Sequence, residues 1–274
     1  MITVDKRGRL GNQMFQYAFG LAAAQRLGTQ HAYNAWTLER YFTVESRWIN
    51  VAKSCAALGS DALHGFDQRE VVADDREDPD LVLESVTDRT RYGGHFYSER
   101  FFLPAASDVR SAFTVRRRHV ERFEREYAAL VDGPYICAHV RLTDFSTYRD
   151  DVTLPPGYYR RALDLLDEDI PVVFVSDEPD RVRTAFAGDP RVRVVANAPI
   201  LDFLLLKHAT QLISSNSSFA WWAAWLNDNE QLRVIAPRWW LGLHEEIELP
   251  VKVILDRWEQ ISPRCAGDGA WPSG

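Results

Sequence analysis

The chain has 274 residues, of which 46% are hydrophobic, and a formal charge of −7 at pH 7. This length can bury a substantial core in one large or two small domains, and the many aromatic residues exclude a largely disordered chain. The negative charge argues against a general nucleic-acid binder, which needs a basic surface to neutralise phosphates. A few well-placed arginines and backbone amides can still bind a diphosphate locally.

Cys55, Cys137 and Cys265 are widely spaced, with neither metal-ligand spacing nor a disulfide framework. We therefore expect a reducing compartment. The N-terminus becomes charged within five residues, unlike a signal peptide, and no stretch approaches the ~20 apolar residues of a membrane helix. These features predict a cytoplasmic protein that binds no nucleic acid. Peripheral attachment to the inner face of a membrane and the oligomeric state stay open.

The first half opens with a predicted strand, Ile2–Val4, and a loop over residues 6–11. Apolar side chains at helical spacing predict a helix over 13–28, and Gly28 is a typical helix stop. Residues 30–110 show no clear pattern.

The acidic stretch 74–79 is typical of a solvated loop. A sparse apolar stripe over 116–130 predicts an exposed connecting helix, and Asp-Gly-Pro at 132–134 breaks the chain. We predict two domains, 1–132 and 133–274.

Strands and helices alternate more clearly along the second half. The predicted strands cover 135–140, 172–175, 192–195, 211–214 and 233–236, and the predicted helices cover 158–166, the residues after Pro179, 200–209 and 217–226. This alternation predicts a parallel sheet covered on both faces, with a ligand beyond the carboxyl ends of its strands. Three polar clusters follow strands in this way: His139 to Asp144, Ser176-Asp177, and Asn216 to Phe219.

Two glycines stand at the first join between strand and helix, in Gly8-Arg9-Leu10-Gly11-Asn12-Gln13. They allow a tight turn and close approach of a ligand to the backbone, and the free N–H groups at the helix start would favour an anion. A purely structural turn is the alternative, although such a turn does not require both Asn12 and Gln13.

An arginine follows the strand at 135–140. Strand alternation places His139 and Arg141 on the same side, and a guanidinium can donate two parallel hydrogen bonds to phosphate oxygens. A structural ion pair between Arg141 and Asp144 is the alternative, as is an ordinary hydrogen-bonded role for His139.

Four serines and an asparagine at 214–218 precede an aromatic helix. One hydroxyl is enough to cap the helix, so the others, with the helix amides, could hold a phosphate. We expect Trp221, Trp222 and Trp225 to pack this helix into the core.

Together these stretches resemble the α-1,2-fucosyltransferase family, whose inverting members use GDP-fucose. The family's G-G-L-G-N-Q-M-F-Q-Y-A opening resembles RLGNQMFQYA at 9–18, which is also similar to the opening of protein O-fucosyltransferases. His139, Arg141 and Asp144 match its H-x-R-x-x-D skeleton. Residues 174–179 resemble the family's F-S-D-D-P segment. Residues 202–226 are similar to its D-x-x-L-M…I-x-N-S-S-F-S-W-W-A-A-W-L block, and residues 236–240 resemble its closing segment.

One departure concerns the arginine motif. The family usually has a second arginine and a glycine after the first arginine, where this chain has Leu142 and Thr143. The substitution removes a positive charge, so the donor sugar is less firmly implied than the fold.

The resemblance implies an α/β fold of the GT-B type, with two Rossmann-type domains whose parallel sheets face across a cleft. It implies that L-fucose passes from GDP-fucose to a hydroxyl of a galactose-containing glycan, through an α-1,2 linkage, with no metal and no cofactor. Arg141 would stabilise the leaving diphosphate, and the other catalytic residues would be His139 and Asp144. The donor-binding residues would be Gly11, Asn12, Gln13, Asp177, Asp202, Asn216, Ser217, Ser218 and Phe219.

Several alternatives stay open. The general base could be Asp144, Asp150 or Asp151, the last two in a loop at 143–157 that could close over the acceptor, or no base is needed. The chain could use another GDP-sugar or a protein hydroxyl, or bind a sugar nucleotide without catalysis. A Rossmann oxidoreductase is disfavoured, because no G-x-G-x-x-G follows a strand with an acidic residue ~20 positions later. Acceptor choice would lie in 30–130, where no resemblance is found.

Overall fold

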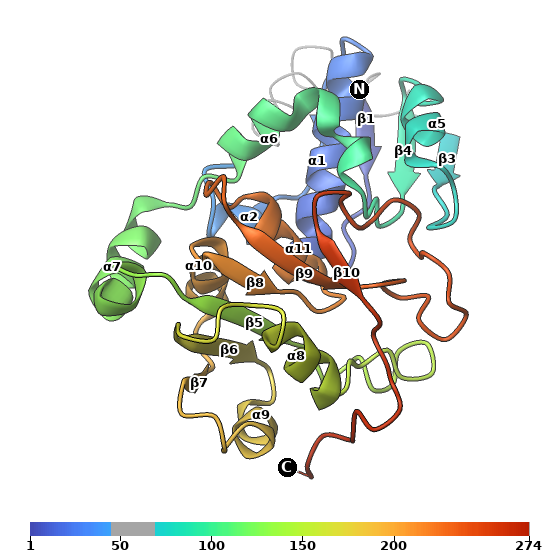
Figure 1. The fold of residues 1–274 in the computed structure, drawn as a ribbon. Coiled ribbons are helices and arrows are strands. Elements are labelled where there is room, and N and C mark those ends of the chain that lie inside the picture. The colour runs from blue at the N-terminus through green and yellow to red at the C-terminus, as the bar shows by residue number, and fades with distance from the viewer. Residues whose placement is uncertain (45–68, 274) are drawn as a thin grey trace. The chain divides into compact units, whose positions relative to one another are not determined.

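The computed structural model describes residues 1–44 and 69–273 (Figure 1). The chain divides into two compact units. Unit 1 comprises Met1–Arg116 and Leu249–Val253, and unit 2 comprises Arg117–Glu248 and Ile254–Gly274.

This division differs from the predicted boundary after residue 132 because helix α7 (Arg117–Val131) belongs to unit 2. Its apolar stripe is buried there: Phe123 stacks on His208 at 5.4 Å, and the Tyr127 hydroxyl donates to Asn197 at 3.0 Å. The helix is therefore half-buried against unit 2, where the sequence predicts an exposed connection.

The described part of unit 1 contains a four-stranded parallel sheet in the order β2-β1-β4-β3. Its strands are β1 (Ile2–Val4), β2 (His31–Ala32), β3 (Arg69–Val72) and β4 (Thr90–Gly93). Its helices are α1 (Leu10–Arg26), α2 (Trp36–Glu39), α5 (Pro79–Glu84), α6 (Ala106–Ala112) and the 3-10 turns η1 (Glu99–Phe101) and η2 (Leu103–Ala105).

Helix α1 begins three residues earlier than the sequence predicts. Gly8 adopts a φ of +70°, which turns the backbone, and Arg9 is extended and serves as the N-cap without a side-chain hydrogen bond. The backbone turn thus defines the start, which side-chain capping rules could not locate. At the other end Gly28 has a φ of +62°, and the predicted stop is confirmed.

Helix α1 and the turns after β4 share an aromatic core. Phe19 stacks on Phe96 with ring centroids 3.8 Å apart, and Phe15 meets Tyr97 edge to face at 5.3 Å.

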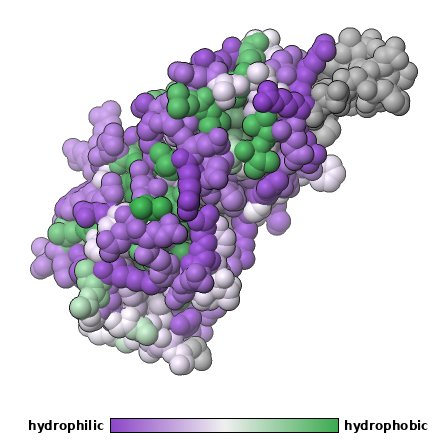
Figure 2. Space-filling view, turned by 90° about the vertical axis from the view of Figure 1, so that its right-hand side faces the viewer, coloured by the Kyte–Doolittle hydropathy of each residue, from purple (hydrophilic) through white to green (hydrophobic). Residues whose placement is uncertain are grey.

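The outer surface is mostly hydrophilic with apolar residues between, as the face in Figure 2 shows.

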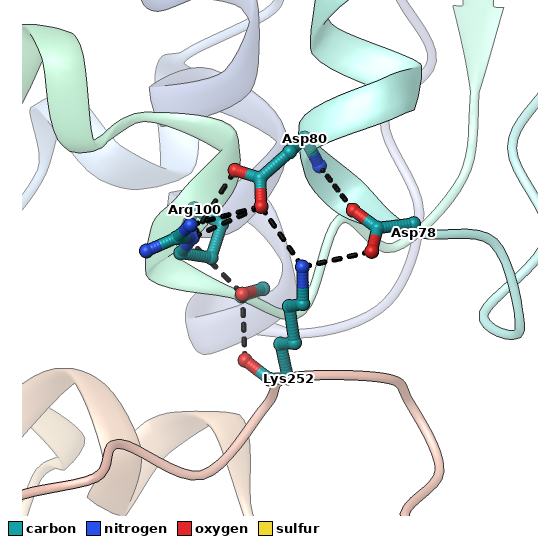
Figure 3. A network of polar contacts seen from close by, with 5 residues as sticks. Asp78, Asp80, Arg100 and Lys252 are labelled. Carbon is teal, nitrogen blue, oxygen red and sulfur yellow. Dashed lines mark hydrogen bonds and ion pairs between the residues drawn. The ribbon is translucent and has the colours of Figure 1, made fainter.

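The segment Leu249–Val253 returns from unit 2 to unit 1 and is held by charged groups (Figure 3). The Lys252 ammonium lies 2.8 Å from Asp78 Oδ2 and 2.9 Å from Asp80 Oδ2, and Arg100 pairs with Asp80 at 3.0 Å. Ser98 also donates to the Lys252 carbonyl at 2.6 Å. Asp78, from the predicted acidic loop, therefore binds the returning segment through Lys252. It also caps α5.

Unit 2 contains a six-stranded parallel sheet in the order β10-β9-β8-β5-β6-β7. Its strands are β5 (Ile136–Val140), β6 (Val172–Ser176), β7 (Val192–Val195), β8 (Gln211–Ile213), β9 (Arg233–Pro237) and β10 (Glu259–Ile261). Besides α7, its helices are α8 (Pro156–Leu163), α9 (Pro179–Ala185), α10 (Pro199–Lys207) and α11 (Ser218–Trp225).

The five predicted strands of the second half all form, but they do not complete the sheet. Strand β10 pairs in parallel with β9, with Gln260 opposite Ala236. Its residues, Glu-Gln-Ile, are too short and too polar to stand out as a strand in the sequence. The edge position beside β9 explains why such a segment can pair there.

The strand order places a topological switch point between β5 and β8. The chain runs from β5 outward through β6 to β7, then returns to β8 and continues the other way to β9. Right-handed crossovers therefore place α8 and α9 on one face, and α10 and α11 on the other. Trp221 and Trp222 of α11 are fully buried and Trp225 nearly so, which confirms the predicted packing role.

In the described part of the chain, no helix is long and apolar enough to cross a membrane. Cys137 is buried in β5 and Cys265 is exposed, both as free thiols, while Cys55 lies outside the described residues.

Candidate active site at the switch point of unit 2

The loops after β5 and β8 border the switch point of the six-stranded sheet. In open parallel sheets this is where ligands bind, outside the carboxyl ends of the strands. The first loop carries Arg141 and Asp144, and the second carries residues 214–217. Two of the three polar clusters that the sequence singles out therefore border the same switch point, and Asp177, after β6, lies beside the first.

Arg141 is largely buried and lies between two carboxylates. Its Nη1 is 2.8 Å from Asp177 Oδ2, and its Nη2 is 2.6 Å from Asp144 Oδ1. The Asp144 contact is close, but Nη2 does not meet the alignment of a hydrogen bond. The ion pair that the sequence offers as an alternative role for Arg141 is thus present, together with a second one to Asp177.

Asp177 gathers donors from the β5 loop. It accepts from the amides of Leu142 and Thr143 at 3.0 and 3.2 Å, and from the Thr143 hydroxyl at 2.5 Å. Burial alone would raise the pKa of Asp177, but these hydrogen bonds and the Arg141 charge hold it below its usual value. Its carboxylate therefore organises the loop, whereas the resemblance implies a donor contact for it.

His139 is a buried residue of β5, and its imidazole is hydrogen-bonded to Ser215. Its Nδ1 lies 2.7 Å from Ser215 Oγ, and the Tyr159 hydroxyl donates to its carbonyl at 3.1 Å. Burial lowers the pKa of His139 to about 4, although Asp177 acts to raise it. The imidazole is consequently neutral at physiological pH. Ser215 belongs to the serine cluster at 214–218 that the sequence singles out, whereas Tyr159 carries no sequence signal that separates it from other core tyrosines.

The loop between β8 and α11 places hydroxyls at a helix start. Ser217 is the N-cap, and its side chain accepts from the Phe219 amide at 3.3 Å. Ser218 opens the helix and is partly exposed, and the Phe219 ring lies 5.7 Å from that of His139. One serine thus caps the helix as predicted, and Ser218 lies, partly exposed, at a helix end that favours anions.

Asn216 ties the β8 loop to two other segments. Its Nδ2 donates to the Val152 carbonyl at 2.8 Å and to the Trp240 carbonyl at 3.3 Å. His244 and Arg264 bind the Asp151 carbonyl at 2.8 and 2.7 Å. These contacts hold the second half of the 143–157 loop in place, and the Asn216 side chain has a structural role in linking the β8 loop to it.

The candidate bases differ in their surroundings. Asp151 accepts from the amide and hydroxyl of Thr153, while Asp144 is ion-paired to Arg141. Asp150 is exposed, with a φ of +58°.

Asp202, at the start of α10, accepts hydrogen bonds from Asn197. The Asn197 amide lies 3.3 Å from both carboxylate oxygens, and its Nδ2 lies 2.8 Å from Oδ1. Burial raises the pKa of Asp202 to about 6, and the bonds from Asn197 act in the opposite direction. The sequence offers no signal that pairs these two residues, because Asn197 precedes the helix in an unremarkable loop.

The first motif lies in unit 1, after β1. A side chain at Gly8 would meet Asn12 Nδ2 at 2.1 Å, so the glycine allows both the turn and the approach of Asn12. Gln13 Nε2 donates to the Gly8 carbonyl at 2.9 Å, while its Oε1 is buried and accepts no hydrogen bond from the described residues. Gly11 lies in the first turn of α1, next to Asn12.

Gln16 is the hub of this motif, which the sequence does not single out. Its Oε1 accepts from the Arg7 amide at 3.0 Å and from the Tyr33 hydroxyl at 2.9 Å. Its Nε2 donates to the carbonyls of Arg7 and Gly94 at 3.2 and 3.4 Å. One fully buried amide therefore joins the loops after β1, β2 and β4.

Two relatives from Escherichia coli are similar to this chain in sequence. The O-antigen biosynthesis glycosyltransferase WbnK is 30% identical over 132 residues, which cover 44% of this chain and 42% of that protein. The match to this relative thus spans less than half of its length. An alpha-1,2-colitosyltransferase is 24% identical over 266 residues, covering 87% of this chain and 91% of that protein.

Solved fucosyltransferase structures share the fold. NodZ alpha-1,6-fucosyltransferase soaked with GDP-fucose has a TM-score of 0.50 at 16% identity, covering 82% of this chain and 92% of that one. POFUT1 in complex with GDP-fucose also has a TM-score of 0.50, at 12% identity, covering 86% and 96%. The expected α/β fold of the GT-B type, with two parallel sheets, is confirmed.

The family model described as Glycosyl transferase family 11 matches residues 1–242. This match spans both units and every motif quoted above, so the chain belongs to glycosyl transferase family 11.

Proposed function

We propose that this glycosyltransferase moves L-fucose from GDP-fucose to a hydroxyl of a galactose-containing glycan and forms an α-1,2 linkage. The observation that carries the proposal is Arg141, held by Asp177 at the carboxyl ends of β5 and β6. A guanidinium fixed at this edge is suited to the oxygens of a diphosphate. The fold, shared with fucosyltransferases whose structures were obtained with GDP-fucose, supports the choice of donor.

The reaction is a single displacement that inverts the anomeric carbon. The acceptor oxygen forms a bond to that carbon while the bond to the diphosphate oxygen breaks, and the electron pair leaves with GDP. The proton of the acceptor hydroxyl passes to one of the candidate bases Asp144, Asp150 and Asp151 or to solvent. Arg141 stabilises the negative charge that grows on the diphosphate. Because the arginine supplies this positive charge, we propose that neither a metal nor a cofactor takes part.

The start of α11 supplies the second group of donor contacts. In this proposal Ser218 and the first amides of the helix bind phosphate oxygens of the donor, as a helix N-terminus favours anions. His139 is neutral at neutral pH, so we assign it the role of holding Ser215 through its Nδ1.

The test is GDP release from GDP-fucose, with and without β-galactosides, for the wild type and Arg141→Ala. If Arg141 supplies about 3 kcal/mol to the transition state, its removal lowers the rate about 10²-fold. Arg122→Ala is the matched control, because Arg122 is a surface residue in an i,i+4 pair with Glu126. Acceptor-stimulated release that survives in Arg141→Ala would contradict the proposed role.

A second donor is favoured by one observation. The relative that matches most of this chain is named an alpha-1,2-colitosyltransferase, and Leu142 replaces the family's second arginine. A donor panel with GDP-fucose, GDP-colitose and GDP-mannose, each offered with the same galactoside, separates the two. Preference for GDP-colitose would keep the linkage and change the sugar.

A further inference from the structure

The Arg141 guanidinium is bound by one carboxylate at each of its outer nitrogens. Nη1 lies 2.8 Å from Asp177 and Nη2 lies 2.6 Å from Asp144. A donor phosphate that uses the parallel N–H bonds of this arginine needs at least one of these positions. A phosphate oxygen that approaches Nη1 or Nη2 from the side of its carboxylate therefore competes with that carboxylate for the guanidinium.

The two carboxylates are held very differently. Asp177 is 18% exposed and accepts three hydrogen bonds from Leu142 and Thr143 in addition to the Arg141 pair. Moving it would leave several donors without a partner.

Asp144 is 50% exposed, and its contact to Nη2 lacks hydrogen-bond alignment. The Thr143 hydroxyl lies 3.5 Å from Asp144 Oδ1. Half-exposed ion pairs of this kind are weak, so Asp144 is the partner that can exchange.

We propose that Asp144 occupies the place on Arg141 that a donor phosphate takes, so that the donor displaces Asp144 while Asp177 keeps the guanidinium oriented. The inference rests on the proposed function in one respect, namely that the ligand at Arg141 is a nucleoside diphosphate. Asp144 then acts as an internal anion that neutralises the arginine until the donor arrives. Asp177 is a positioning residue, because it acts through Arg141.

The proposal gives two carboxylates on one arginine opposite effects on binding. Removing the Asp144 charge frees Nη2 and removes a repulsive charge near the phosphate, so the variant binds anions more tightly. Removing the Asp177 charge releases the guanidinium from its orientation, so that variant binds more weakly. A general electrostatic effect would change both affinities in the same direction.

The experiment titrates GDP, and separately inorganic pyrophosphate, into the wild type, Asp144→Asn, Asp177→Asn and Asp180→Asn by calorimetry. We expect Asp144→Asn to tighten both ligands about 3- to 10-fold, as expected when a competing internal ion pair is removed. Asp177→Asn should weaken both about 10-fold. Asp180→Asn removes one exposed negative charge shortly after β6 and should change affinity less than about 2-fold.

Thermal unfolding of each variant confirms that it is folded before its affinity is compared. Unchanged or weaker binding of both ligands by Asp144→Asn would overturn the proposal, as would equal tightening by Asp180→Asn. Sugar transfer is measured separately. A wild type that transfers nothing, with Asp144→Asn still tightening pyrophosphate, would refute the proposed function and leave the exchange at Arg141 standing.

Discussion

The hydroxyl of Thr143 donates a 2.5 Å hydrogen bond to Asp177, the carboxylate that orients Arg141. Thr143 stands where the resembling family usually has glycine, so this bond is a feature of the present chain. It strengthens the link between the loops after β5 and β6 at the position where the second arginine is absent.

Replacing Thr143 by valine should therefore loosen the orientation of Arg141, because Asp177 loses one of the hydrogen bonds that hold it. Valine keeps the shape and removes the hydroxyl, and a single hydrogen bond to a charged group contributes about 1.5 kcal/mol. We expect kcat/KM for the donor to fall about 10-fold in Thr143→Val. Thr143→Ser keeps the hydroxyl and should retain most of the activity. Equal losses in both variants would show that the methyl group, not the hydrogen bond, matters.

Arg141→Lys should be nearly as inactive as Arg141→Ala. An ammonium keeps the charge but has no planar fork, so it cannot contact Asp177 and a phosphate in the same geometry. We expect a loss of roughly 30- to 100-fold in kcat/KM with GDP-fucose. Arg122→Lys provides the same exchange on the surface of α7 and should be neutral. Activity within a few-fold of the wild type in Arg141→Lys would mean that charge alone is sufficient.

The pH dependence of stability should respond to Asp202 in a defined direction. Its folded pKa of about 6 lies above the unfolded value of 3.8, so the native state binds the extra proton between about pH 4 and 6. The contribution of Asp202 to the free energy of unfolding is therefore fully present below about pH 4 and is lost as the pH rises from there through 6. Asp202→Asn removes this loss and should gain about 1–3 kcal/mol relative to the wild type between pH 4 and pH 7.

His139 contributes with the opposite sign. Its folded pKa of about 4 lies below 6.5, so its burial destabilises the fold as the pH falls through this window. The two groups partly cancel in the wild type, and urea unfolding of Asp202→Asn at several pH values should therefore show a steeper rise of stability with pH. A variant curve parallel to the wild type would mean that Asp202 is ionised normally.

Gln16 should be the least replaceable polar residue of α1. Gln16→Met keeps the size but leaves the amide of Arg7 and the carbonyls of Arg7 and Gly94 without this partner. Buried groups that lose their partners cost about 1–3 kcal/mol each, so we expect unit 1 to lose roughly 2–4 kcal/mol in urea unfolding. Gln25→Met, on the exposed side of the same helix, should cost less than about 0.5 kcal/mol.

Metal removal should leave catalysis intact if Arg141 supplies the charge that a metal would otherwise provide. The measurement is the rate of GDP-fucose transfer after dialysis against EDTA, with and without added Mg²⁺ or Mn²⁺. We expect equal rates. A loss that the metal restores would refute metal independence without touching the role of Arg141.

Local patterns in the sequence were sufficient for five of the six strands in the sheet of unit 2 and for the helices between them. Residues close in sequence define the buried apolar runs of β5, β6 and β8 and the helices between them. Strands that alternate with helices in this way form a parallel sheet. Because all carboxyl ends of such a sheet lie at one edge, the sequence could also indicate where Arg141 and Asn216 would be found.

The partners of these residues depended on the tertiary structure. Asp177 meets Arg141 and Thr143 only because β6 pairs in parallel with β5, and Asn216 reaches Val152 only because the 143–157 loop folds back over β8. Strand β10 forms only beside β9.

The same reason applies to Lys252, whose segment returns to unit 1 to meet Asp78 and Asp80. Periodicity reports which face of an element is buried, because that depends on residues a few positions apart. It does not report which distant carboxylate a buried arginine or lysine will meet. That choice is made by strand order and by loops that bring remote segments together, and in this protein it defines the geometry of the candidate site.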